Sequence, residues 1–220
     1  MPILEDRIQE FVSRLLAWRR KYRRSFPWRE TRNPYRVLVA ELMLHRTKAQ
    51  QVVPVYRSFI ENYPTPEALA DTTVERIRSE ISSLGLEYRA TRLKKIAKIL
   101  VDHYGGQVPS NFKSLRQLPG VGAYIANAVL CFAFGRDRPL LDTNVIRVIH
   151  RVFSIPIPPD SHKKKKLWDL MERIVPQDGA REFNLAILDL GALICKARKP
   201  EHDKCPLKDI CDLNLSMHKF

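Results

Sequence analysis

The chain has 220 residues, and its 38 lysines and arginines outnumber its 24 aspartates and glutamates to give a net charge of +14. So basic a composition predicts a polyanionic partner, with nucleic acid as the first candidate. The sequence has no run of 18 apolar residues and begins with a charged amphipathic pattern, so it indicates neither a membrane span nor a signal peptide. Four cysteines without a secretory leader favour a reducing compartment, and we expect a cytoplasmic, nucleoid-associated protein.

Apolar residues recur at helical spacing from the N-terminus and predict an amphipathic first helix through Leu4, Ile8, Phe11 and Leu15. A basic and aromatic stretch at 18–24 follows it. This stretch could contact phosphates, and a solvated helix end explains it equally well. Because no later segment shows sustained period-two alternation, we expect an all-α protein.

Capping signals mark the helices that follow. Asn-Pro at 33–34 and Thr-Pro at 65–66 each place an N-cap residue before a proline at the first helical position. Thr72 with Glu75 fits a capping box for a third helix, which Gly85 would close. These signals predict short linkers between consecutive helices.

Further helices are predicted in the second half of the chain. An apolar pattern at 93–101 ends at a glycine pair, and a later helix runs from residue 142 to about Phe153. A proline-rich stretch at 155–159 should be extended, and a helix should begin near the lysine run at 163–166. One more apolar helix leads into a cysteine cluster.

The segment at 118–124, Leu-Pro-Gly-Val-Gly-Ala-Tyr, suits a tight turn between two helices because glycine accepts positive φ without a Cβ clash. Such a turn places the backbone N–H groups of Gly120, Val121 and Gly122 at the mouth of the second helix, where they can bind an anion. No lysine follows in the Walker position, so the turn is better suited to bind a DNA phosphate than a nucleotide. The segment alone leaves an ordinary helix–helix turn open as the alternative.

Residues 118–126 resemble the helix-hairpin-helix of the endonuclease III and MutY superfamily of DNA glycosylases. Residues 141–148 resemble the segment that carries the catalytic aspartate of that family. The similarity extends from about Phe26 to Cys211, nearly the whole chain. The hairpin alone is common in DNA-binding proteins, but hairpin, aspartate segment and terminal cysteine cluster in this order are not.

This resemblance implies two helical domains that flank a cleft. Residues 27–138 would form a six-helix domain with the helix-hairpin-helix. Residues 1–26 and 139–220 would form the second, N/C-terminal domain with the metal-cluster loop. Base removal would then take place in the groove between the domains.

Asp142 is the catalytic residue that the resemblance implies. Breaking an N-glycosidic bond builds positive charge on the sugar, which a nearby carboxylate can stabilise while it steers or activates water. A helix start should also favour the anionic form. Taken alone, Asp142 would be an N-cap, and the two roles do not exclude each other.

Tyr124 distinguishes activities within the family. Members with strand-cleaving lyase activity place a lysine there, whose amine forms a Schiff base with the sugar. Tyrosine cannot do this, and no lysine occurs between Lys113 and Lys163, so we expect a monofunctional glycosylase that leaves an abasic site. The tyrosine resembles that of archaeal-type thymine/uracil mismatch glycosylases, where it could stack on or shape the pocket for a pyrimidine; alone it could be a helix-surface aromatic.

Glu41 matches a glutamate that protonates the purine in adenine glycosylases and is also present in thymine mismatch relatives. A partly buried carboxyl group can donate a proton. The alternative is a helix-surface glutamate.

Three further residues match DNA contacts of the family. A flipped base leaves a hole in the duplex that something must fill. Leu86 matches the family loop whose apolar residue wedges into the duplex, although on its own it would be assigned to the core. His45 and Arg46 match the strand-separating or orphan-base contacts, and Arg46 could equally hold a flanking phosphate.

The terminal cluster reads Cys195-x6-His202-x2-Cys205-x5-Cys211. The family has cysteine at all four positions and binds a [4Fe–4S] cluster. Histidine can ligate iron in clusters, but three thiolates with one imidazole also describe a structural zinc site. We therefore expect a [4Fe–4S] cluster, with zinc or no metal as alternatives and His202 as a non-ligand still open. Cys131 belongs to the apolar helix after the hairpin and is predicted to be core.

Together these residues predict a monomeric glycosylase that hydrolyses thymine or uracil opposite guanine in mismatched double-stranded DNA, using Asp142 and a water. A first rival is a MutY-like adenine glycosylase acting on A·G or A·8-oxoG pairs. Glu41 favours that rival, whereas Tyr124 and the chain end nine residues after Cys211, where those enzymes carry a further domain, do not. A second rival is a non-catalytic helix-hairpin-helix DNA-binding protein, which would have no need for Asp142.

Overall fold

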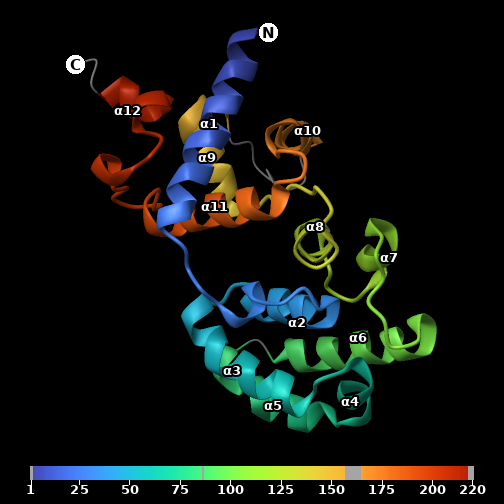
Figure 1. The fold of residues 1–220 in the computed structure, drawn as a ribbon. Helices are drawn as coiled ribbons and strands as arrows, with labels where there is room; N and C mark the ends of the chain where they lie inside the picture. The colour runs from blue at the N-terminus through green and yellow to red at the C-terminus, as the bar shows by residue number, and fades with distance from the viewer. Residues whose placement is uncertain (1, 86, 157–164, 218–220) are drawn as a thin grey trace. The chain divides into compact units, whose positions relative to one another are not determined.

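The computed structural model describes residues 2–85, 87–156 and 165–217 and divides into two compact units (Figure 1). Unit 1 combines both ends of the chain, Met1–Arg24 and Asp137–Phe220, and unit 2 is Ser25–Arg136. The described residues form helices joined by short loops and contain no β-strand, so the all-α prediction is confirmed. None of the described helices is long and apolar enough to cross a membrane.

Unit 1 packs the first helix of the chain against its last long helix. Its helices are α1 (Pro2–Lys21), α9 (Thr143–Phe153), α10 (Lys165–Ile174), α11 (Ala180–Leu193) and α12 (Asp212–Met217), with the 3-10 turns η4 (His202–Lys204) and η5 (Lys208–Ile210). α11 packs against both α1 and α9. At the centre of the unit the buried ring of Phe11 meets Phe153 and Phe183 edge-on, with ring centroids 5.3 and 6.1 Å apart. The apolar face of the first helix therefore joins the two ends of the chain.

A buried ion pair fixes the end of α1. Asp189 of α11 has no exposed surface and accepts hydrogen bonds from Arg19 at 3.1 Å and from Nε of Arg24 at 2.5 Å. An unpaired carboxylate at this depth would be strongly destabilising. These two arginines of the basic stretch at 18–24 thus have a structural role, while Arg20 and Arg23 are exposed.

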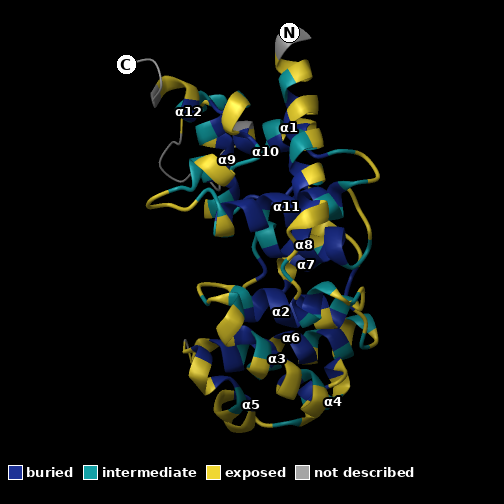
Figure 2. Ribbon diagram, turned by 60° about the vertical axis from the view of Figure 1, so that its left-hand side comes forward, coloured by how far each residue is buried: buried dark blue, intermediate teal, exposed yellow. Residues whose placement is uncertain are grey.

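Unit 2 is organised around α2 and α6. Its helices are α2 (Pro34–Leu44), α3 (Ala49–Asn62), α4 (Pro66–Asp71), α5 (Val74–Ile81), α6 (Tyr88–Tyr104), α7 (Phe112–Gln117) and α8 (Ala123–Phe132), with the 3-10 turns η1 (Pro27–Arg29) and η2 (Ser82–Leu84). α6 packs against α2, α4 and α5, and α2 also packs against α3 and α8. Figure 2 shows α2 as largely buried, which fits a helix that is apolar on most of its faces.

The capping predictions in unit 2 are confirmed at two helices and wrong at a third. The side chains of Asn33 and Thr65 accept backbone N–H bonds at the starts of α2 and α4. At α5 the cap is Thr73, whose hydroxyl accepts a backbone N–H bond, and not Thr72. Thr72 ends α4, and its carbonyl accepts a hydrogen bond from Lys94 of α6. Local sequence signals do not report this tertiary contact, and the observed cap lies one residue later than the predicted one.

Other boundaries follow the sequence with one omission. α9 ends at Phe153 as predicted, and α6 ends at Tyr104, followed by Gly105 as its C-cap with φ +57°. The sequence signals do not predict α3, which contains Pro54 in its interior. The proline-rich residues 157–159 and the predicted helix start around the lysine run lie largely outside the described residues.

Candidate functional site

The predicted hairpin is formed by α7, the turn at 118–122 and α8. The N–H of Val121 donates to the carbonyl of Leu118 at 3.0 Å and closes the turn. Gly122 is the N-cap of α8, and its carbonyl accepts the first helical bond from Ala126. The amides of Gly122 and Ala123 therefore lie at the helix start, where the helix itself offers no acceptor. This end of α8 can bind an anion, whereas the Val121 amide is already used inside the turn.

The two hairpin glycines differ in what they require. Gly120 has φ +75°, a conformation that side chains of L-residues rarely adopt. A Cβ there would lie 2.2 Å from Nε of Arg92, whose guanidinium stands 4.8 Å from the ring centroid of Tyr88. Gly122 has an ordinary φ of −78°, so the expectation of positive φ in this turn holds only for Gly120. The structure thus places an arginine directly against the turn.

Tyr124 and Glu41 lie on two helices that pack together. Tyr124 is the second residue of α8 and is half-buried, and α8 packs against α2. Glu41 is only 6% exposed, so it is not the helix-surface glutamate that the sequence left open. Cys131, further along α8, is 1% exposed and confirms its predicted place in the core.

His45 and Arg46 follow the end of α2 and are both exposed. Arg46 has φ +60°, which is uncommon for a residue other than glycine. Partial burial lowers the pKa of His45, and the nearby cations Arg46, Arg89 and Arg92 lower it further. Three arginines therefore lie close enough to the turn after α2 to act on His45. The predicted wedge residue, Leu86, lies outside the described residues.

Asp142 is the N-cap of α9 in unit 1. Its Oδ1 accepts the N–H of Val145 at 2.8 Å, and its Oδ2 accepts from the side-chain amide of Asn144 at 3.1 Å. The carboxylate is half-buried. The capping role suggested by the sequence is thus present, and it holds the carboxylate in one orientation.

Hydrogen bonds continue from Asp142 to the cysteine loop. Oδ1 of Asn144 accepts from Arg147 at 2.8 Å, and Nε of Arg147 donates to the carbonyl of Cys195 at 2.8 Å. Arg147 also donates to the carbonyl of Gly191 at 2.7 Å. The orientation of the carboxylate therefore depends on the packing of α9 against α11 and on the loop that begins at Cys195.

Gly191 permits this close packing, and its replacement by alanine is expected to lower stability. A Cβ at Gly191 would lie 2.8 Å from Cβ of Asn144 and 3.5 Å from its backbone. Overpacking of this kind costs about 1–3 kcal/mol. Gly191→Ala should therefore lower the thermal midpoint of unfolding, measured by calorimetry. An unchanged midpoint would show that α9 and α11 can move apart here at no cost.

The four predicted metal ligands line one hollow. Cys195, His202, Cys205 and Cys211 all contribute to it, together with Arg151, which donates from Nη1 to Sγ of Cys195 at 3.4 Å. Burial raises the pKa of Cys205 to about 11, so in the free protein this thiol is protonated and a metal would have to displace the proton. Among the described residues no group of three or more His, Cys, Asp or Glu side chains has the geometry of a metal site. The donor types, three thiols and one imidazole, fit an iron–sulfur cluster or a zinc ion.

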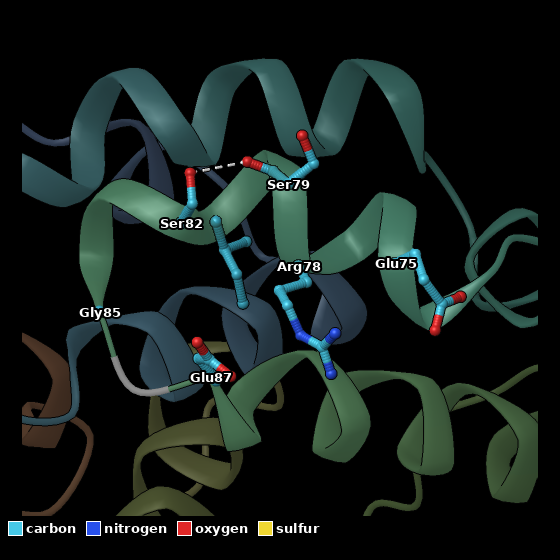
Figure 3. Close-up of a pocket in the computed structure, with 7 residues that line it drawn as sticks. Glu75, Arg78, Ser79, Ser82, Gly85 and Glu87 are labelled. Atoms are coloured by element: carbon cyan, nitrogen blue, oxygen red, sulfur yellow. Dashed lines mark hydrogen bonds between the residues drawn. The ribbon is translucent and has the colours of Figure 1, made fainter.

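A separate hollow lies elsewhere in unit 2. About 480 Å³ in volume, it lies beside α5 and the start of α6, and Figure 3 shows Arg78 extending from α5 towards that start. Two carboxylates, Glu75 and Glu87, line it with this single arginine. None of the predicted site residues that the structure describes contributes to it, and its acidic lining disfavours a polyanion.

Sequence reasoning missed four polar residues of these sites. Arg89 lies four residues before Leu93, on the apolar face of α6, and a charge on that face was the available signal. Asn144 and Arg147 are three residues apart and so share one face of α9. Nothing in the sequence signals that Arg92 lies against Gly120, because this contact depends on the tertiary fold.

Comparison with known proteins gives consistent matches. Residues 39–173 match the HhH-GPD superfamily of base excision DNA repair proteins, and residues 195–211 match the iron–sulfur binding domain of endonuclease III. The chain is 44% identical over 212 residues to the thymine-DNA glycosylase of Aeropyrum pernix, covering 94% of this chain and 95% of that protein. It is 41% identical over 202 residues to the thymine/uracil-DNA glycosylase of Methanothermobacter thermautotrophicus, covering 91% of each. An adenine DNA glycosylase of Buchnera aphidicola is 36% identical, and the chain covers 60% of it.

Solved structures agree with these matches. A thermostable thymine-DNA glycosylase superposes with a TM-score of 0.92 at 39% identity, covering 96% of this chain and 98% of that one. A non-covalent endonuclease III–DNA complex superposes with a TM-score of 0.84 at 25% identity, covering 98% and 99%.

Proposed function

The chain belongs to the HhH-GPD superfamily of base excision DNA repair proteins and is a DNA glycosylase, and we propose that it removes thymine or uracil mispaired with guanine and leaves an abasic site. The observation that carries the hydrolytic mechanism is the carboxylate of Asp142, fixed at the start of α9 by hydrogen bonds to both of its oxygens. Relatives named for thymine and uracil, at 41–44% identity over most of the chain, support the choice of pyrimidine.

Duplex DNA is the proposed partner, bound by the protein as a monomer. The amides at the start of α8 and the arginines around them form a binding site, which we call the phosphate seat, for a backbone phosphate. Arg92 lies against Gly120, and Nη1 of Arg116 would lie 3.8 Å from a Cβ at Gly122, so two cations lie close to the hairpin glycines. Once the target nucleotide is out of the stack, Leu86 would fill the gap, and His45 and Arg46 would contact the opposite strand.

Asp142 would act on the sugar. As the bond to the base breaks, positive charge develops on the sugar ring, and an oriented carboxylate stabilises that charge at little cost in reorganisation. The same carboxylate would align the attacking water and receive its proton, while the base leaves. The orientation imposed by Asn144 supports this role because it fixes the second carboxylate oxygen.

Tyr124 would leave the enzyme without lyase activity. The phenol at the start of α8 has no amine to form a Schiff base with the sugar. Its half-buried ring would instead contact the flipped pyrimidine. Adenine removal is the second candidate, because the buried Glu41 could protonate a purine and because adenine glycosylases are also similar to the chain.

A single assay separates these activities. Labelled duplexes with T·G, U·G, A·G and A·8-oxoG pairs are incubated with the protein and then treated with alkali or left untreated. We expect strand breaks at thymine and uracil, and only after alkali. Breaks without alkali would reveal lyase activity and contradict the role given to Tyr124, and breaks at adenine would favour the second candidate. A lack of product on every duplex would contradict the proposal as a whole.

The iron–sulfur binding domain at 195–211 is proposed to hold a [4Fe–4S] cluster through Cys195, His202, Cys205 and Cys211. These residues already line one hollow, and their thiols and imidazole are ligands that iron accepts. When bound, the cluster would order the loop rather than take part in hydrolysis. A structural zinc bound by the same four residues remains the competing assignment.

Metal analysis tests this assignment. Anaerobically purified protein should contain about four iron and four sulfide per chain and absorb visible light. His202→Ala should lose cluster on gel filtration, whereas His103→Ala, at an exposed histidine in α6, should keep it. Colourless protein with one zinc would contradict the cluster, and a His202→Ala variant with full iron would contradict the ligand role of the imidazole.

A further inference from the structure

Arg89 is a buried cation that has no carboxylate partner among the residues the structure describes. It is the second residue of α6 and is 3% exposed. Its Nη2 donates to the carbonyl of His45 and, at 2.8 Å, to Oγ1 of Thr47. Nε and Nη1 are buried without a hydrogen-bond partner, and no ion pair involves this guanidinium in the part of the chain that the structure describes. Removing a charge from water without a compensating partner costs free energy. We therefore expect Arg89 to have a role that offsets this cost.

The two acceptors of Arg89 stand on either side of Arg46. His45 precedes Arg46 and Thr47 follows it, so one guanidinium nitrogen holds both neighbours of that residue. Arg46 has φ +60°, and the N–H of Thr47 donates to the carbonyl of Leu44 at 3.1 Å. A left-handed arginine persists only where its surroundings impose the conformation. Arg89 is a buried side chain that binds both neighbours of Arg46.

The surroundings of this turn are positively charged. Arg46, Arg89 and Arg92 all act on the imidazole of His45, and no carboxylate of the described residues is among the groups that perturb it. Both His45 and Arg46 have exposed side chains, whereas Arg89 does not reach the surface. The buried arginine therefore cannot contact DNA in this conformation and must act through the exposed one.

We propose that Arg89 is a positioning residue that fixes the turn at 45–47 so that Arg46 reads guanine in the strand opposite the excised base. This role rests on the proposed function. Arg46 then presents a guanidinium fork, which matches the O6 and N7 acceptors of guanine and not the edge of adenine. The selectivity for guanine would thus depend on a residue that never touches the DNA.

The test compares excision of uracil opposite guanine with excision of uracil opposite adenine, under single-turnover conditions with enzyme in excess over the labelled duplex. The first control is the activity of the wild-type protein on the duplex with uracil opposite guanine. If the wild type does not excise uracil there, the proposed function itself is wrong, and this failure is distinct from a failure of the inference about Arg89. Arg89→Met replaces the buried charge with an apolar chain of similar length. We expect it to lower the guanine-to-adenine rate ratio about tenfold, in line with the loss of one bidentate base contact.

A merely structural role would give a different result. Loss of folded protein lowers both rates equally and leaves the ratio unchanged, and that outcome would overturn the proposal. An equal loss of affinity for both duplexes would also overturn it, because Arg46 would then be holding a phosphate. Thermal unfolding of each variant shows whether the protein is folded.

A double-mutant comparison shows whether Arg89 acts through Arg46. Arg46→Ala should lower the ratio by a similar factor, and Arg46→Ala combined with Arg89→Met should lower it no further. Losses that multiply would mean that the two arginines act independently and would overturn the proposal. If Arg89→Met does not fold, Thr47→Val supplies the same test, since it removes one of the two acceptors with little change in volume and should lower the ratio in the same direction.

Discussion

Asp142→Asn is expected to slow single-turnover base excision by about 10³-fold, while duplex affinity remains close to that of the wild type. The substitution removes the negative charge that would face the developing charge on the sugar. It also removes the basic oxygen that would receive the proton of the attacking water. Both losses act in the transition state and neither acts on the bound duplex, so the rate falls without a matching change in affinity.

Asparagine is the informative replacement because it preserves the cap. Asparagine and aspartate are about equally good N-caps, so the bond from the N–H of Val145 can be kept. The new amide would face the side-chain amide of Asn144, which now donates to the carboxylate. Rotation of Asn144 would in turn disturb its bond with Arg147. We therefore expect a small loss of stability, of about 1 kcal/mol, which lowers the thermal midpoint by roughly 2–4 °C.

Three measurements on the same preparation check this prediction: the plateau rate of excision at saturating enzyme, the dissociation constant for a T·G duplex, and the thermal midpoint. Asp142→Ala is the matched control, since it removes both the charge and the cap and should lose about a further 1 kcal/mol of stability. Asp142→Asn with a near wild-type rate would show that the residue is only a cap. Loss of duplex binding together with stability would lead to the same conclusion.

Local sequence signals predict much of the fold around Asp142 and the hairpin. The cap at Asp142, the helix that follows it and the hairpin before it are set by residues adjacent in the chain, and periodicity and glycine placement report such features. The structure adds that the cap and the proposed catalytic group are one side chain, with both oxygens occupied. Its assignment as catalytic still came from resemblance, because a capping aspartate alone is common.

Residues whose roles arise from tertiary contacts could not be predicted. In the sequence, Arg89 differs from its neighbours only as a charge on an apolar helix face. Its contacts with the turn at 45–47 require α6 to lie beside the end of α2. The capping-box pattern predicts a cap at Thr72, and it does not report the hydrogen bond from Lys94, which is 22 residues away in the sequence. The sequence does not indicate that residue 191 must be glycine. A Cβ is excluded there because Asn144 of α9 lies too close, and this contact depends on the tertiary fold.

Gly120 and Gly122 provide the second test, because the sequence treats them alike and the structure does not. Gly120→Ala is expected to weaken duplex binding about tenfold and to lower stability by about 1–3 kcal/mol. Alanine at φ +75° is strained, and its Cβ would displace Arg92 from its place against the turn and over the ring of Tyr88. The amides that follow would then no longer point at one phosphate.

Gly122→Ala should leave stability unchanged. Its φ of −78° suits any residue, and the nearest atom to a new Cβ, Nη1 of Arg116, is 3.8 Å away. Calorimetry and fluorescence anisotropy on both variants separate the two causes of weaker binding. If Gly122→Ala keeps its thermal midpoint but binds duplex more weakly, the added methyl group lies where a phosphate would, which supports the anion seat. If Gly120→Ala binds duplex as tightly as the wild type, the turn does not hold DNA, and the phosphate seat at the start of α8 must be abandoned.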